Sequence, residues 1–142
     1  MMVLVRMFRV LEHLKACADL HTALKPYLKR CEEELINDAL PVMRPLFYHY
    51  DEEEAYTIKD EYLLGQDLLI APVTEEGASL RKVWLPKDEW TDFWTGKQYT
   101  GGSYIVDAPL GRIPVFVRTK ALPEDLSYPL KSVLESLSAV TD

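Results

Sequence analysis

The chain has 142 residues, of which 48% are hydrophobic and 27% are charged, and its formal net charge is −7. A chain of this length buries enough surface to fold without a metal or a disulfide, and its composition is typical of a globular protein. Nucleic acids and anionic membranes bind basic surfaces, so the acidic balance argues against both as partners. A neutral sugar is compatible with it.

The two cysteines, Cys17 and Cys31, lie fourteen residues apart in a segment with a helical pattern. At 1.5 Å per residue they would be about 21 Å apart, which is too far for a disulfide. We expect buried free thiols. Residues 1–10 lack the apolar run and cleavage site of a signal peptide, and no stretch has the ~20 apolar residues of a membrane span. These features predict a cytoplasmic protein.

Residues 3–35 carry apolar side chains mostly at steps of three and four, which predicts a helix. Pro26 lies inside this pattern, where it should kink the helix or begin a second one. The helix should end near Asn37 and Asp38, before Pro41.

Residues 41–50 are mostly apolar and predict a strand that is covered on both faces. Residues 51–54 form an acidic loop. A short helix should follow through residues 61–64, with Thr57 as its N-cap, Asp60 and Glu61 near its start and Gly65 at its end.

After Gly65, short strand-like runs alternate with turn residues, which predicts an antiparallel β-sandwich. The expected strands are residues 68–73, 80–85, 90–94, 98–100, 103–107 and 113–118, with turns at 75–77, 86–89 and 95–97 and a break at 101–102. A last amphipathic helix is expected over residues 127–140, with Ser127 as its N-cap.

Several motifs occur together in one order. They are KPYL at residues 25–28, LPVMRPLF at 40–47, EYLLGQDLLIAPV at 61–73, WLP at 84–86, WTDFWTG at 90–96 and RIPVFVR at 112–118. This set resembles family 31 of the glycoside hydrolases, which includes α-glucosidases and α-xylosidases. The resemblance covers residues 3–118 and implies the end of a (β/α)8 barrel followed by the family's proximal β-sandwich.

The resemblance therefore implies an α+β fragment from the C-terminal part of a larger enzyme. Residues 1–65 would be the terminal helix-strand-helix of an incomplete barrel, residues 66–120 the sandwich, and residues 121–142 a C-terminal helix. The free apolar surface of such a piece should seek the rest of the barrel or a second copy.

The implied activity is retaining hydrolysis of terminal α-linked glycosides, with an α-linked oligosaccharide as the substrate of the parent enzyme. Both chemical roles belong to carboxyl groups, so no cofactor is expected. The resemblance places both catalytic Asp residues on earlier barrel strands, and no carboxylate here lies in a matching motif. We therefore expect the chain alone to be inactive.

His49 ends the predicted barrel strand, and active sites of such barrels lie at the C-terminal strand ends. It is the best candidate for substrate binding, although a strand-end surface histidine fits the same pattern. Arg44, in the same strand, should form a structural ion pair with a carboxylate across the barrel. The acidic runs at residues 32–34 and 51–54 are interpreted as solvated surface.

Aromatic residues are dense in the predicted sandwich, at Trp84, Trp90, Phe93, Trp94 and Tyr99. Side chains of this kind pack in cores and between domains. They can also stack on sugars, which gives the alternative function of a non-catalytic carbohydrate-binding or assembly module. Exposed coplanar indoles would favour sugar binding, whereas buried indoles would exclude it.

Overall fold

The structure is a computed structural model that describes residues 2–109 and 112–121. The described residues belong to two compact units, Met1–Glu33 and Glu34–Leu122 as far as each is described, and each unit is treated by itself. The C-terminal helix expected at residues 127–140 lies outside the described residues.

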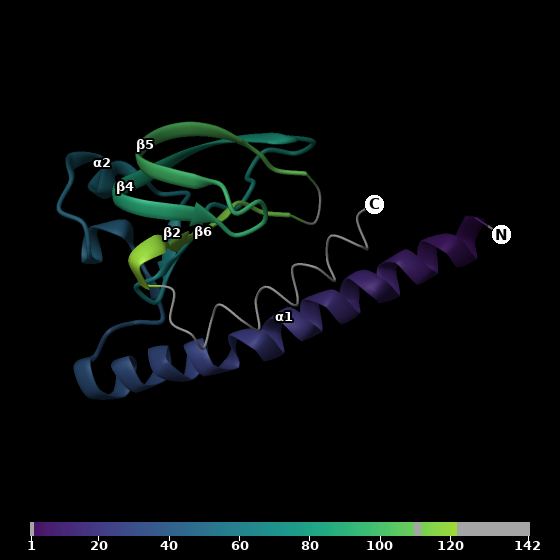
Figure 1. The fold of residues 1–142 in the computed structure, drawn as a ribbon, viewed down its shortest axis with the longest axis horizontal. Coiled ribbons are helices and arrows are strands. Elements are labelled where there is room, and N and C mark those ends of the chain that lie inside the picture. The colour runs from purple at the N-terminus through teal and green to yellow at the C-terminus, as the bar shows by residue number, and fades with distance from the viewer. Residues whose placement is uncertain (1, 110–111, 122–142) are drawn as a thin grey trace. The chain divides into compact units, whose positions relative to one another are not determined.

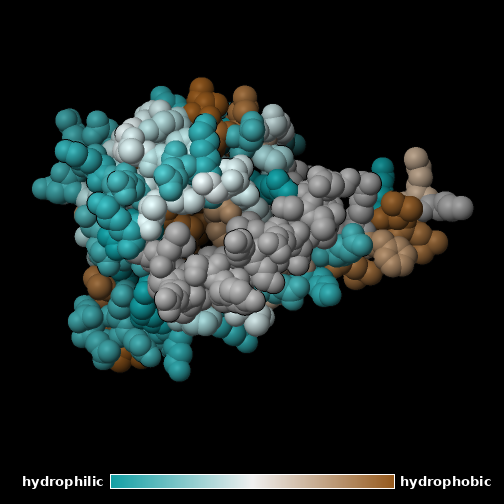
Figure 2. Space-filling view, in the orientation of Figure 1, coloured by the Kyte–Doolittle hydropathy of each residue, from teal (hydrophilic) through white to brown (hydrophobic). Residues whose placement is uncertain are grey.

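The first element is one continuous helix, α1 (Met2–Asp38), with Pro26 inside it. Pro26 therefore does not begin a second helix. The helix ends where expected, because Ala39 takes a positive φ of 55° just before Pro41. Figure 2 shows hydrophobic side chains gathered at the N-terminal end of α1, where apolar residues such as Phe8 are exposed.

Neither cysteine of α1 is in a disulfide, as expected, but only Cys31 is buried. The expectation of two buried thiols is wrong for Cys17, which is exposed. Its sulfur lies 3.7 Å from the Nε2 atom of His13, one helical turn away.

The expected strand over residues 41–50 is reduced to β1 (Met43–Arg44), and a 3₁₀ helix, η1 (Leu46–Tyr48), follows it. Pro45 separates the two elements, since it cannot donate a hydrogen bond to a strand ladder. β1 pairs antiparallel with β2 (Tyr62–Leu64), not in parallel as a barrel strand would.

The short helix expected through residues 61–64 is also wrong, because those residues include β2. The helix lies earlier, at α2 (Glu53–Thr57), where Thr57 is the last residue and not the N-cap. Gly65 does adopt the left-handed conformation, with φ of 65°, but it opens the turn from β2 to β3 (Leu68–Ile70).

All strand pairs are antiparallel, as predicted, and the described strands form one six-stranded sheet in the order β1-β2-β3-β6-β4-β5. Figure 1 labels β2, β4, β5 and β6 of this sheet. The remaining members are β4 (Leu80–Asp92), β5 (Gln98–Asp107) and β6 (Val115–Arg118), and a second 3₁₀ helix, η2 (Thr119–Ala121), follows. Two separate facing sheets are not present among these strands.

β4 and β5 are each longer than expected. The segment at residues 86–89 is not a turn but a register shift in β4, between Leu85 and Glu89. β5 continues through Gly101, where an added Cβ would lie 2.7 Å from the Cα of Lys87. Glycine therefore does not break β5; it lets the backbone of β5 pass close to the bulge in β4.

The core lies within the unit that contains the sheet. Val83 and Leu85, from the first half of β4, belong to the same buried cluster as Leu63, Leu69 and Phe116. β2 and β4 are not neighbours in the sheet, so the bulge in β4 brings its first half over the central strands. A single bent sheet thus encloses a core of the kind expected from a sandwich.

The sheet contains strands from both sides of residue 65. The predicted domain limit at that residue therefore does not coincide with a limit of the sheet. It stays a prediction that part of residues 1–65 completes a barrel.

Candidate functional site

Arg44 is the centre of a buried polar group. Its side chain is 1% exposed, and its Nη2 donates to the Oε2 atom of Glu34 at 2.5 Å. Its Nε donates to the carbonyl of Pro41 at 2.6 Å, and its Nη1 lies 3.0 Å from the Nε2 atom of His49. The predicted ion pair is confirmed, but its carboxylate comes from α1. The interpretation of residues 32–34 as solvated surface is therefore wrong for Glu34.

His49 is half-buried and follows η1 directly. A guanidinium can only donate hydrogen bonds, so the Nε2 atom of His49 accepts from Arg44. Burial lowers the pKa of His49, and the positive charge of Arg44 lowers it further. The imidazole is thus neutral at pH 7 and satisfies a buried arginine. Its predicted contact with substrate stays a prediction.

A second ionic group joins β6 to the turn after β2. The Nη2 atom of Arg118 lies 2.9 Å from the Oδ1 atom of Asp67, which is 4% exposed. The Nη1 atom of Arg118 lies 3.9 Å from Asp88 in the bulge of β4. The hydroxyl of Tyr50 donates to Asp88 at 3.0 Å, and burial together with this bond raises the pKa of Tyr50.

The acidic loop at residues 51–54 is anchored as well. A side-chain oxygen of Glu52 accepts from the backbone N–H of Lys87 at 2.6 Å. The carboxylate of Asp51 accepts from the hydroxyl of Tyr56 at 2.7 Å. The interpretation of this run as solvated surface holds for Asp51, Glu53 and Glu54, which are exposed, but Glu52 is half-buried. Glu52 also bonds to the bulge of β4, which holds the loop in place.

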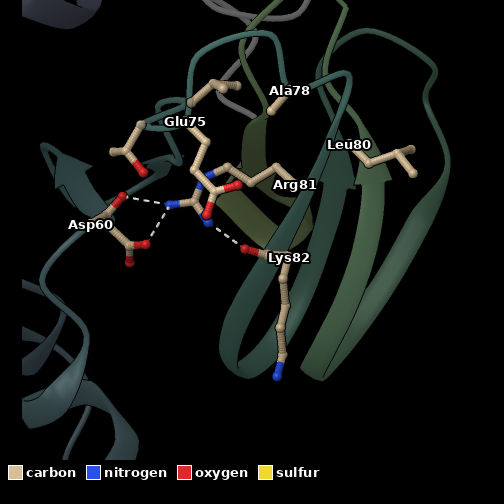
Figure 3. A pocket seen from close by; sticks show the side chains of 8 residues that line it. Asp60, Glu75, Ala78, Leu80, Arg81 and Lys82 are labelled. Carbon is tan, nitrogen blue, oxygen red and sulfur yellow. Dashed lines mark hydrogen bonds and ion pairs between the residues drawn. The ribbon is translucent and has the colours of Figure 1, made fainter.

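Arg81 occupies one wall of a small pocket of about 260 Å³ (Figure 3). Its guanidinium donates to the carbonyls of Pro72, Asp60 and Lys82, and it lies 3.3 Å from the carboxylate of Asp60. Asp60 thus forms an ion pair and does not cap a helix. The carbonyl partners on the guanidinium leave it poorly suited to bind a further anion.

Glu61 lies behind Arg81 and is 5% exposed. Its Oε1 atom accepts from the backbone N–H of Trp84 at 2.8 Å and lies 4.0 Å from Arg81. Its Oε2 atom has no hydrogen-bond partner in the described part of the chain. Burial outweighs both favourable contacts and raises the pKa of Glu61 to about 7. Nothing in the sequence pattern identified this group beyond its place in a motif.

The described carboxylates near these arginines are engaged in ion pairs or backbone contacts, which gives them structural roles. Within residues 2–109 and 112–121, no cluster of three His, Cys, Asp or Glu is arranged to hold a metal ion. Over the same residues, no helix combines the length and apolar character needed to cross a membrane.

The aromatic residues of the sheet mostly pack. Trp90 is fully buried and its Nε1 donates to the carbonyl of Pro86 at 3.0 Å, and Phe93 is 7% exposed. Trp94 is half-buried and its Nε1 donates to the carbonyl of Ile113 at 2.7 Å. The buried indole of Trp90 excludes it from a sugar-binding surface, by the criterion set from the sequence.

An aromatic group that sequence reasoning missed lies on η1 and α2. Phe47, Tyr48 and Tyr56 are 44%, 47% and 57% exposed. The rings of Phe47 and Tyr56 are parallel within 4°, with centroids 5.4 Å apart, and Tyr48 lies 5.8 Å from Phe47. The predicted strand over residues 41–50 had suggested that Phe47 and Tyr48 are covered.

Comparison with known proteins agrees with the sequence motifs. Residues 39–122 match the family described as glycosyl hydrolase family 31 C-terminal domain. A sulfoquinovosidase of Escherichia coli is 46% identical over 122 residues, and an α-glucosidase of Bacillus thermoamyloliquefaciens is 39% identical over 95. The matches cover 85% and 66% of this chain but only 18% and 12% of those relatives.

Solved structures give the same result. A family 31 sulfoquinovosidase from E. rectale, in complex with an aza-sugar inhibitor, aligns with a TM-score of 0.80 at 42% identity, over 87% of this chain and 18% of that one. A family 31 α-xylosidase from a soil metagenome aligns with a TM-score of 0.76 at 41% identity, over 86% and 18%. The chain belongs to glycosyl hydrolase family 31, and the part of it from residue 39 to residue 122 is that family's C-terminal domain.

Proposed function

We propose that this chain serves as the C-terminal domain of a retaining α-glycosidase that hydrolyses terminal α-linked glycosides. The observation that carries the proposal is the match of residues 39–122 to the family's C-terminal domain. The chain spans about a fifth or less of the length of the relatives it matches. The rest of such an enzyme would supply the catalytic carboxyl groups.

The geometry supports a scaffolding role for the described residues. A retaining glycosidase needs two carboxyl groups about 5–5.5 Å apart, one of them free to act as a nucleophile. Here Glu34, Asp67 and Asp60 are engaged by arginines. We therefore propose that the chain alone does not hydrolyse glycosides.

We also propose that the contribution of this chain to the catalytic barrel is α1. The family match begins at residue 39, one residue after α1 ends. β1 and β2 pair in the same sheet as β3. Both observations support a limit near residue 39 in place of the one first expected at residue 65.

A chimeric enzyme tests the domain assignment. Residues 39–122 would replace the matching segment of the E. coli sulfoquinovosidase, which is 46% identical to this chain. We expect a soluble chimera that retains hydrolysis of that enzyme's substrate, whereas the same enzyme with the segment deleted should be inactive. A folded chimera without activity would refute the assignment.

The purified 142-residue chain tests the second part of the proposal. It would be incubated with nitrophenyl α-glucoside, α-xyloside and α-sulfoquinovoside, beside an identically purified sample from cells without the gene. We expect release of nitrophenol at the background rate. Turnover that co-purifies with the chain and follows its concentration would show that the chain carries its own catalytic groups.

A further inference from the structure

The aromatic patch formed by Phe47, Tyr48 and Tyr56 is exposed without an evident partner in the described part of its own unit. Each of the three residues is between 44% and 57% exposed, although Phe47 stacks on both tyrosines. Clustered apolar surface that faces water is costly and marks sites of interaction. The patch therefore indicates a contact surface.

The patch is held in place by bonds that would be unnecessary for a passive surface loop. Tyr50 is tied to Asp88, Glu52 to the backbone of Lys87, and Tyr56 to Asp51. The contacts of Tyr50 and Glu52 fix the segment between η1 and α2 on the bulge of β4, and the bond between Tyr56 and Asp51 holds the segment to α2. A contact surface that is fixed before binding loses little conformational entropy when its partner covers it.

The arrangement of the rings favours a protein partner over a sugar. Sugars stack on open ring faces, but the parallel rings of Phe47 and Tyr56, 5.4 Å apart, are turned toward each other. The hydroxyl of Tyr56 already donates to Asp51. Edges and side surfaces of this kind suit packing against apolar side chains.

We propose that the patch of Phe47, Tyr48 and Tyr56 is the surface on which another domain of the same family 31 enzyme packs, through an apolar face of its own. The inference rests on the proposed function, because the relatives are more than five times as long as the part that this chain matches. In the whole enzyme these three side chains are buried between domains.

Site-specific thiol labelling tests this surface. Y56C would be prepared in the isolated chain and in the chimera, with I105C as the matched control, since Ile105 is 74% exposed on β5. Labelling at each position would be read by peptide mass spectrometry. We expect labelling at position 56 to be at least about tenfold slower in the chimera than in the isolated chain. At position 105 the rates should agree within about twofold.

Equal labelling of position 56 in the two proteins would overturn the inference. Should the Y56C chimera fail to fold, a cysteine at the aligned position of the E. coli enzyme gives the same measurement in a natural full-length protein. Fast labelling there would also overturn it. Because labelling does not depend on turnover, an inactive but folded chimera would count against the proposed function while this result still stood by itself.

Two further measurements on the isolated chain distinguish other occupants. Isomaltotriose that shifted the NMR signals of Tyr56, but not those of Phe8 on α1, would identify a sugar site and overturn the inference. Self-association abolished by Y56A but not by F8A would identify a second copy as the occupant, with the same consequence. We expect neither effect.

Discussion

The buried carboxyl group of Glu61 gives the sharpest quantitative prediction. Its side chain is almost without exposure, and burial raises its pKa to about 7 despite the N–H of Trp84 and the charge of Arg81. The ordinary value is 4.5. At neutral pH the native protein therefore holds a carboxyl group that is about half ionised in a place that favours the neutral form.

The sign follows from proton binding. Between pH 4.5 and 7 the unfolded chain has released the proton of Glu61 while the native protein keeps it, so native stability falls as pH rises. The contribution of protonated Glu61 to native stability is fully present below pH 4.5 and is lost as pH rises through 7. At about 1.4 kcal/mol for each pH unit, the difference between a pKa of 4.5 and one of about 7 corresponds to about 3–4 kcal/mol.

The variant E61Q isolates this effect, because an amide of the same shape does not ionise. Urea unfolding at intervals from pH 4 to pH 8 would be compared with that of the natural chain. We expect the stability of E61Q relative to the natural chain to increase by about 3–4 kcal/mol across this range. Subtracting the stability of the natural chain from that of E61Q also removes the opposite contribution of His49, which is the same in both proteins. The lowered pKa of His49 costs stability as pH falls below 6.5.

The matched control is E75Q, since Glu75 lines the pocket that Arg81 also lines but is exposed. The stability of the E75Q variant should change with pH in the same way as the stability of the natural chain. Parallel curves for E61Q as well would refute the reasoning, because they would mean that Glu61 titrates alike in the folded and unfolded states.

Two other substitutions test contacts that hold the sheet. E34A removes the carboxylate from a buried guanidinium and should lower the free energy of unfolding by about 2 kcal/mol, less than for a fully buried pair because Glu34 is 29% exposed. The control E33A, also measured by urea unfolding, should change the free energy of unfolding by less than about 0.5 kcal/mol. An equal loss in both variants would contradict the pairing of Glu34 with Arg44. G101A places a Cβ 2.7 Å from the Cα of Lys87 and should cost about 1–3 kcal/mol. S103A on the same strand is its control, and an unchanged melting temperature for G101A would show that β5 does not need the close approach.

The sequence was most informative where a single residue imposes its own conformation. Gly77 and Gly96 take the positive φ of 74° that their predicted turns require. The end of α1 before Pro41 follows from the same local rules. Antiparallel pairing after Gly65 was also predictable, because the alternation of apolar and polar residues along a short strand depends on few neighbouring residues.

Errors occurred where distant contacts decide the local structure. The polar run at residues 86–89 has the composition of a turn, yet it remains in β4 as a bulge because Tyr50 and Glu52 bind it from far along the chain. The run at residues 61–64 was expected to be helical, yet pairing with β3 makes it β2. Propensity within a short window contains no information on such partners.

The predicted site was found only in part for the same reason. His49 and Arg44 were chosen from one segment, and the structure does join them, at 3.0 Å. The sequence does not single out Glu34, because three adjacent glutamates predict a solvated surface. Its role depends on the position at which α1 ends relative to β1, which periodicity does not give.

The family motif around Arg44 was recognisable even though its expected strand was mostly absent. A buried arginine needs a carboxylate and further acceptors in fixed directions, since an unpaired buried charge is strongly destabilising. Glu34, the carbonyl of Pro41 and His49 supply them here. The residue types that these bonds require restrict substitution more than strand propensity does. A motif can therefore identify a family while the helix or strand assigned to it is wrong, and the same bonds connect the end of α1 to the segment that presents the aromatic patch.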